Sequence, residues 1–287
     1  MDNAGTPHSA IQDTCIEKCT YNKYSFFVKR EDNACLAPGP PFAKVRGLFP
    51  QLQHLKAKGV QVVGYMETTI SMAGWGVSYF AKKLGMQAVI YKPTYIDGKN
   101  RHNQEIQVKK WEENDAIIRN IQATRLQINW FQARKELLEE FPNAYMLEQG
   151  LPFKQTVLEV SKQVTKEMKK FKTIVMCIGS GTMAAGVLKG LQQQNIVCDL
   201  YGIFVAPKNE KKMKQKIYGM AGIFNSGFFN VYGGNLILVD TGCAYTDKEI
   251  TKCPFPCNPY YDRKAWKWFM ANKNDLEQPV LFWNIGA

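Results

Sequence analysis

The sequence predicts an α/β protein with two lobes, in which mostly parallel sheets are covered by helices. Three observations predict it. The length of 287 residues corresponds to about two domains. The composition, 45% hydrophobic and 22% charged, is that of a packed globular chain. From Lys58 onward, short apolar runs alternate with longer helical patterns, which is the rhythm of strands joined by crossover helices.

The strands of this pattern are apolar runs flanked by polar residues and glycines. We expect strands at Val60–Tyr65, Gln87–Tyr91, Ala116–Ile121, Thr173–Ile178 and Leu200–Val205. The first two enclose one complete right-handed crossover unit.

The helices show apolar residues at helical spacing. We expect them at Met72–Leu84, Arg125–Phe141 and Thr156–Phe171. The apolar residues of the second helix, Leu126, Ile128, Trp130, Phe131, Leu137 and Leu138, are expected to form a wide face in the core. The exposed side of the third is expected to carry most of its lysines.

The elements divide into a larger lobe, residues 1–49 with 146–287, and a smaller inserted α/β lobe, residues 50–145. The longest apolar run is only Ile174–Ile178, which predicts no membrane helix. The first thirty residues do not resemble a secretory signal, so we expect a cytoplasmic protein.

Eight cysteines fit reduced thiols in that compartment. The pairs Cys15/Cys19 and Cys253/Cys257 are at the loose edge of zinc-ligand spacing, and no suitably spaced histidine follows either. We therefore expect no metal.

A glycine-rich loop follows the strand at Thr173–Ile178 and opens a helix. Gly179, Ser180, Gly181 and Thr182 offer small side chains, hydroxyls and the backbone N–H groups of a helix start, which together bind a phosphate. With Ala184, the glycines also match a dinucleotide fingerprint, although no acid stands at the far end of the next strand. A tight packing turn is a further alternative.

Lys44 stands at the start of the helical stretch that follows a proline cluster. A helix start and partial burial disfavour the ammonium form, and a neutral amine can form a Schiff base with a carbonyl. An ordinary surface lysine is the alternative, because most lysines are solvated.

Five segments occur in the order found in a known family. They are Val28–Asp32, Phe42–Arg46, Ser71–Gly85, Gly179–Thr182 and Leu281–Ala287. From about residue 25 onward the chain resembles the tryptophan synthase β-like (fold-type II) pyridoxal-phosphate enzymes, nearest the aminocyclopropane-carboxylate deaminase and D-cysteine desulfhydrase branch.

The resemblance implies a role for each segment. Lys44 would carry pyridoxal 5'-phosphate as a Schiff base, and Gly179, Ser180, Gly181 and Thr182 would hold its phosphate. Thr68, Thr69 and Ser71, with Ile70 between them, would receive the substrate carboxylate, and Asn284 would approach the pyridine ring. Relatives of this family commonly form homodimers.

The chain departs from the family at three positions near the cofactor. Ala43 precedes the lysine where relatives commonly have Asn, and Met72 stands where another Asn faces the ring oxygen. Asn284 lies in an altered C-terminal segment, which bears on the strength of the electron sink. These changes indicate a divergent member.

The formal net charge of +12 favours a polyanionic partner such as DNA, or a solvated basic surface. Two basic stretches carry much of it. One contains Lys208, Lys211, Lys212, Lys214 and Lys216; the other places Arg263, Lys264 and Lys267 among Tyr260, Tyr261, Trp266, Trp268 and Phe269. Lysines release counterions from phosphates and rings stack on bases, whereas a solvated helix with core aromatics gives the same pattern.

Three functional hypotheses follow. The main one is a pyridoxal-phosphate lyase or deaminase that acts on an amino acid through Lys44. The second is a pyridoxal-phosphate enzyme, for example a decarboxylase, that tailors an amino-acid group attached to a nucleic-acid base. The third is a non-catalytic binding module on the same scaffold.

Overall fold

The computed structural model describes residues 10–68, 70–95, 101–223 and 234–287. The chain forms two compact units, one made of residues 1–47 and 154–287 and the other of residues 48–153. Each unit has its own β-sheet. We call them the discontinuous unit and the continuous unit.

The sheet of the discontinuous unit has the strand order β1-β2-β10-β7-β8-β9. Its strands are β1 (Ile16–Tyr21), β2 (Tyr24–Arg30), β7 (Thr173–Ile178), β8 (Asp199–Phe204), β9 (Leu236–Val239) and β10 (Val280–Asn284). All neighbours are parallel except β1 and β2, which form an antiparallel pair. Strand β10 therefore lies between β2 and β7 although it follows both in sequence.

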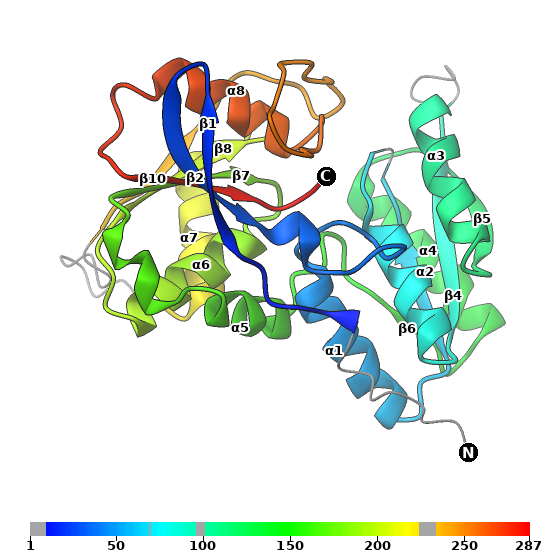
Figure 1. The fold of residues 1–287 in the computed structure, drawn as a ribbon. Coiled ribbons are helices and arrows are strands. Elements are labelled where there is room, and N and C mark those ends of the chain that lie inside the picture. The colour runs from blue at the N-terminus through cyan, green and yellow to red at the C-terminus, as the bar shows by residue number, and fades with distance from the viewer. Residues whose placement is uncertain (1–9, 69, 96–100, 224–233) are drawn as a thin grey trace. The chain divides into compact units, whose positions relative to one another are not determined.

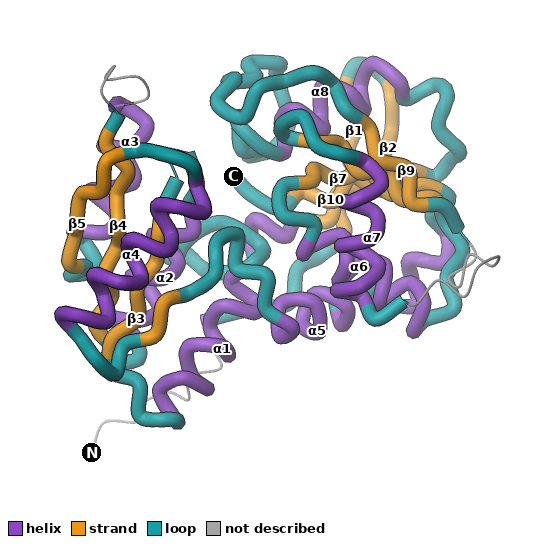
Figure 2. Tube along the Cα trace, turned by 180° about the vertical axis from the view of Figure 1, so that it is seen from behind, coloured by secondary structure: helices purple, strands orange, loops and turns teal. Residues whose placement is uncertain are grey.

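Helices cover both faces of this sheet, as Figures 1 and 2 show. They are α5 (Lys154–Lys162), α6 (Thr182–Gln193), α7 (Glu210–Ala221) and α8 (Asp262–Asn272), with short 3-10 helices at Glu31–Asn33 and Lys166–Lys170. Successive side chains of a strand point to opposite faces. Ile174 and Met176 of β7 accordingly pack with α5, α6 and α7, whereas Val175 and Cys177 pack with α8.

The continuous unit contains a parallel sheet in the order β5-β4-β3-β6. Its strands are β3 (Val62–Met66), β4 (Gln87–Thr94), β5 (Ile117–Gln122) and β6 (Tyr145–Met146). Its helices are α2 (Ala73–Lys83), α3 (Arg101–Glu112) and α4 (Leu126–Glu140), and α1 (Val45–Ala57) contains the boundary between the units. The predicted crossover unit is confirmed as β3, α2 and β4.

The helix expected at Thr156–Phe171 is wrong in its extent. Helix α5 ends at Lys162, and a separate 3-10 helix follows at Lys166–Lys170. Thr165 between them has extended backbone, with φ −105° and ψ 166°. Val164 and Thr165 are β-branched, which disfavours helix continuation.

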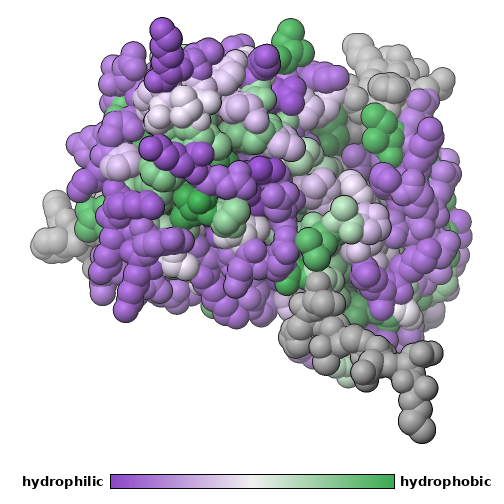
Figure 3. Space-filling view, in the orientation of Figure 1, coloured by the Kyte–Doolittle hydropathy of each residue, from purple (hydrophilic) through white to green (hydrophobic). Residues whose placement is uncertain are grey.

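The predicted lysines on this segment are exposed: Lys162, Lys166, Lys169 and Lys170. In Figure 3 hydrophilic side chains cover much of this edge of the discontinuous unit.

The expected apolar core face of α4 is wrong in part: Leu137 is fully buried and Trp130 packs against the core, but three of the expected residues do not pack there. Leu126, Ile128 and Phe131 are 49%, 53% and 56% exposed. The buried positions of α4 are Asn129, Ala133 and Leu137, which recur every four residues. Asn129 is buried because its Oδ1 accepts the Thr124 N–H at 3.0 Å. The number of apolar residues on this helix therefore does not identify the side that faces the sheet.

In the part of the chain that the structure describes, no helix has both the length and the apolar character that crossing a bilayer requires.

Candidate functional site

The glycine loop joins β7 to α6 at the carboxyl edge of the sheet. Gly181 has φ +86° and stands immediately before α6. A Cβ at this position would lie 2.8 Å from Ile217 Cγ1 and 3.0 Å from Met213 Sδ of α7. Backbone and space both require glycine here. Among the described residues no side chain caps the α6 N-terminus. Its first N–H groups have no partner within the helix, so they suit an anion.

Lys44 reaches this loop from the segment before α1. Its Nζ donates to Ser180 Oγ at 3.2 Å, and Ser180 Oγ is 2.9 Å from Thr182 Oγ1. Burial lowers the pKa of Lys44 to about 8; the Cys177 thiol opposes that shift and the Lys216 ammonium adds to it. The neutral amine, which is the nucleophilic form, is thus accessible near neutral pH.

Buried ion pairs hold the backbone around Lys44. Arg46 donates to Glu31 through Nε at 2.6 Å and Nη2 at 3.1 Å, and Lys29 Nζ lies 3.7 Å from Glu31 Oε1. All three side chains are at most 5% exposed. This network ties the first turn of α1 to the end of β2, so that Lys44 projects from a fixed backbone.

The end of β10 lies beside the same backbone. The Ala43 N–H donates to the Ile285 carbonyl at 2.9 Å. Asn284 is fully buried, and its Nδ2 donates to the Pro256 carbonyl at 2.9 Å. Asn284 Oδ1 has no hydrogen-bond partner among the described residues.

Asp262 adds a second buried oxygen without a partner. Its Oδ1 accepts the Ile285 N–H at 2.8 Å, and the Cys177 thiol also interacts with the carboxyl group, whereas Oδ2 has no nitrogen or oxygen partner among the described residues. Burial raises the pKa of Asp262 to about 8. Buried polar atoms are normally satisfied, so two unpaired oxygens at one end of the sheet fit a ligand that carries an N–H donor. Together with Lys44 and the glycine loop, this donor and acceptor set fits pyridoxal phosphate.

The predicted carboxylate loop belongs to the continuous unit, at the junction of β3 and α2. Glu67 is fully buried and accepts the Thr68 N–H at 2.7 Å and the Gly74 N–H. Ser71 Oγ accepts the Ala73 N–H at 3.0 Å. Met72 is the N-cap residue of α2, and Thr69 lies outside the described residues.

Burial raises the pKa of Glu67 to about 7, against the effect of these hydrogen bonds. A resident carboxyl group thus occupies N–H groups at this helix start.

The structure brings part of the predicted set together. Lys44 and the loop Gly179–Thr182 meet in the discontinuous unit, and the end of β10 with Asn284 lies beside the backbone of Ala43. Thr68, Ser71 and Met72 form a separate group in the continuous unit.

Sequence reasoning missed Glu67 and Asp262. Glu67 directly precedes the predicted carboxylate loop, and Asp262 lies within the second basic stretch, but the property that sets them apart is burial, which a single sequence does not display.

The two basic stretches differ in the structure. Lys211, Lys212 and Lys216 of the first are exposed on α7. In the second, Lys264 is 2% exposed, and its Nζ donates to the carbonyl groups of Val205 and Ala244 at 2.8 and 2.7 Å.

Trp266 and Phe269 of the second stretch lie on the buried side of α8 and pack against the sheet of the discontinuous unit. Of the two alternatives drawn from the sequence, core aromatics therefore holds for Trp266 and Phe269, and these two rings are not available to stack on bases.

Comparison with known proteins gives the same fold and points to one family. A family model described as pyridoxal-phosphate dependent enzyme matches residues 19–226. A glycyl-dTMP PLP-dependent decarboxylase from Pseudomonas phage M6 is 31% identical to this chain. The alignment covers 96% of this chain and 99% of the relative.

Two solved structures are similar over nearly their whole length. An ACC deaminase homologue superposes with a TM-score of 0.76 at 21% identity, covering 96% of this chain and 90% of that one. An O-acetylserine dependent cystathionine β-synthase from Helicobacter pylori gives 0.65 at 18% identity, with coverage of 100% and 96%. Both share the fold of this chain.

Proposed function

The chain belongs to the pyridoxal-phosphate dependent enzymes, and from that premise we propose that it decarboxylates an amino-acid group attached to a thymidine nucleotide. The family and the cofactor predicted from the ordered segments are confirmed. The substrate is the new element. It corresponds to the second hypothesis drawn from the sequence, rather than to the main one.

One observation supports this substrate above the others. The relative that matches the chain from end to end carries out decarboxylation on glycyl-dTMP, according to its name. The likeness to the ACC deaminase homologue, at 21% identity, concerns the fold alone. A lyase or deaminase of free amino acids stays a prediction, and the experiment below separates it from the proposal.

The residues of the discontinuous unit suit such a reaction. Lys44 would hold the cofactor through its amine, and Ser180, Thr182 and the α6 N–H groups would hold the phosphate. The unpaired Asn284 Oδ1 would accept an N–H of the ring, and the Asp262 carboxyl group would do so in its ionised form. Pyridoxal phosphate, when bound, withdraws electrons from the bond that breaks at the α-carbon.

The proton balance gives Lys44 a second role. When the carboxylate leaves as CO2, the electron pair of the broken bond stays on the α-carbon, which must take up one proton. A Lys44 amine with a pKa of about 8 can hold that proton and release it near neutral pH. Ser180 Oγ, 3.2 Å away, fixes the position of the amine. The product keeps the amino group and has lost only CO2.

The test is incubation of the cofactor-loaded protein with glycyl-dTMP in D2O, followed by mass spectrometry of the product. We expect a product lighter by one CO2 that retains nitrogen and carries one deuterium on carbon from solvent. Release of ammonia with formation of a keto acid from free amino acids, and no change in glycyl-dTMP, would refute the proposal and support the deaminase hypothesis. Lys44→Ala is the inactive control.

A further inference from the structure

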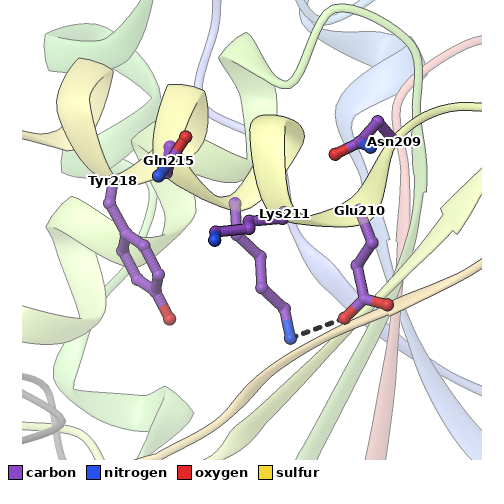
Figure 4. Close-up of a pocket in the computed structure, with 6 residues that line it drawn as sticks. Asn209, Glu210, Lys211, Gln215 and Tyr218 are labelled. Carbon is purple, nitrogen blue, oxygen red and sulfur yellow. Dashed lines mark ion pairs between the residues drawn. The ribbon is translucent and has the colours of Figure 1, made fainter.

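One face of α7 carries residues suited to a chain of phosphates. Lys211, Lys214, Gln215 and Tyr218 recur at the spacing i, i+3, i+4 and i+7, so they share one side of the helix. With Asn209 and Glu210 they line a hollow of about 620 Å³ (Figure 4). We call these four residues the α7 face.

The charge of this segment is strongly positive. Residues 208–216 contain five lysines and one glutamate. Glu210 pairs with Lys214 at 2.7 Å, but both side chains are solvent-accessible, so the pair is weak and Lys214 can contact a phosphate as the other lysines can. Burial raises the pKa of the half-buried Tyr218, so its phenol keeps its proton and can donate to an anionic oxygen.

The same helix reaches the reaction site on its other side. Met213 and Ile217 are buried, and both face the space beside Gly181 of the glycine loop. Burial is the main cause that lowers the pKa of Lys44 and of Lys208, and the Lys216 ammonium lowers both further, so Lys216 lies within electrostatic reach of both. Positive charge thus extends along α7 from the neighbourhood of Lys44 to the α7 face.

We propose that the α7 face binds the sugar-phosphate backbone of a polynucleotide whose modified base enters the site at Lys44. The inference rests on the proposed function for the identity of that base. A single nucleotide held beside Lys44 carries one phosphate and gains little from lysines on the far side of α7. A polynucleotide repeats its charge along its length and releases counterions at each lysine contact.

Reaching Lys44 requires that the base leave the stack. Enzymes that act on a base inside DNA extrude it from the duplex or use a single strand, while contacts to the flanking backbone hold the rest. The α7 face lies on the same unit as Lys44, so its contacts remain in place while the base is at the site.

The test compares binding of a short fluorescein-labelled DNA duplex without modified bases, measured by anisotropy over a range of salt concentrations. The variants are Lys211→Gln with Lys214→Gln, and, as a matched control, Lys166→Gln with Lys169→Gln on the exposed 3-10 helix of the same unit. We expect the α7 variant to bind about tenfold more weakly, and the slope of log affinity against log salt to fall by about two.

The control variant should bind as the wild type does. Turnover of glycyl-dTMP as a free nucleotide should be equal in all three proteins. Equal duplex affinity in the wild type and the α7 variant, or binding of dTMP with no binding of duplex, would overturn the inference. If glycyl-dTMP is not decarboxylated but the duplex still requires the α7 lysines, the proposed function fails and the polynucleotide surface stands.

Discussion

Two strand-to-helix junctions in this molecule have the same local architecture, but their polar side chains make different hydrogen bonds. At the β3–α2 junction, the Glu67 carboxyl accepts the Gly74 N–H and Ser71 Oγ accepts the Ala73 N–H, both at the helix start. At the β7–α6 junction, the hydroxyl groups of Ser180 and Thr182 form a hydrogen bond with each other, and Lys44 Nζ donates to Ser180 Oγ. Among the described residues no side chain caps this helix. The first junction is occupied by a carboxyl group of its own, and the second suits an anion that arrives from solution.

The largest expected effect comes from Lys44, because the β7–α6 junction has chemical significance only with its amine. Lys44→Ala should lower decarboxylation by at least about a thousandfold, since both the attachment group and the proton donor are lost. Borohydride reduction followed by peptide mass spectrometry should place the cofactor on Lys44 in the wild type. Lys58→Ala, at an exposed position, should keep both activity and label. A label on another lysine would contradict the assignment.

The buried carboxyl group of the β3–α2 junction is tested through pH. Glu67 has a pKa of about 7 in the folded chain, against an ordinary 4.5. The folded chain therefore binds the Glu67 proton more tightly than the unfolded chain does. Protonation of Glu67 makes its full contribution to the free energy of unfolding below pH 4.5, and this contribution is lost as the pH rises through 7. Between these limits we expect the wild type to lose about 3 kcal/mol of unfolding free energy relative to Glu67→Gln.

Urea denaturation of both proteins at several pH values measures this difference. The same substitution at Glu113, an exposed glutamate of the same unit, is the control. Parallel curves of unfolding free energy against pH for the wild type and Glu67→Gln would show that Glu67 is not the group responsible.

A smaller effect is expected from Gly181→Ala at the β7–α6 junction. The left-handed backbone and the 2.8 Å approach to Ile217 both oppose a Cβ, which should cost about 2 kcal/mol of stability. Gly219→Ala is the matched control in α7, because a Cβ there meets nothing within 4 Å and alanine favours a helix. Thermal unfolding should rank the two variants in opposite directions from the wild type. An unchanged Gly181→Ala midpoint would contradict the close approach.

The smallest expected effects come from two serines that occupy corresponding places. Ser71→Ala removes the acceptor of the Ala73 N–H and should lower stability by about 1 kcal/mol. Ser180→Ala should instead weaken cofactor binding about fivefold, with little change in stability without the cofactor, since its hydroxyl faces Lys44. Cofactor titration and denaturation of each variant separate the two outcomes. Equal effects of both variants on both measurements would remove the distinction between the junctions.

The sequence predicted the elements whose local chemistry is distinctive. The loop Gly179–Thr182 follows an apolar strand and combines glycines with hydroxyl groups, so these residues predict its position at the start of a helix. Lys44 has no such local signal, and it was predicted only because the segment that contains it is one of five segments that occur in the order of a known family.

Burial direction was harder to predict, because it depends on partners far along the chain. Phe131 of α4 and Trp266 of α8 are both aromatic residues in helices, yet one is 56% exposed and the other fully buried. The carboxyl groups of Glu67 and Asp262 are a related case. Only the packing of other segments around them makes their pKa values unusual.

The position of β10 in its sheet has a consequence for the order of assembly. Strand β10 separates β2, which leads to Lys44, from β7, which leads to the glycine loop, and it follows both by a long stretch of chain. On the ribosome, the continuous unit of residues 48–153 is complete well before β10 is made. The nascent chain therefore carries a finished smaller unit while the two halves of the other sheet await their middle strand. We therefore expect the cofactor to bind only after that strand has been inserted.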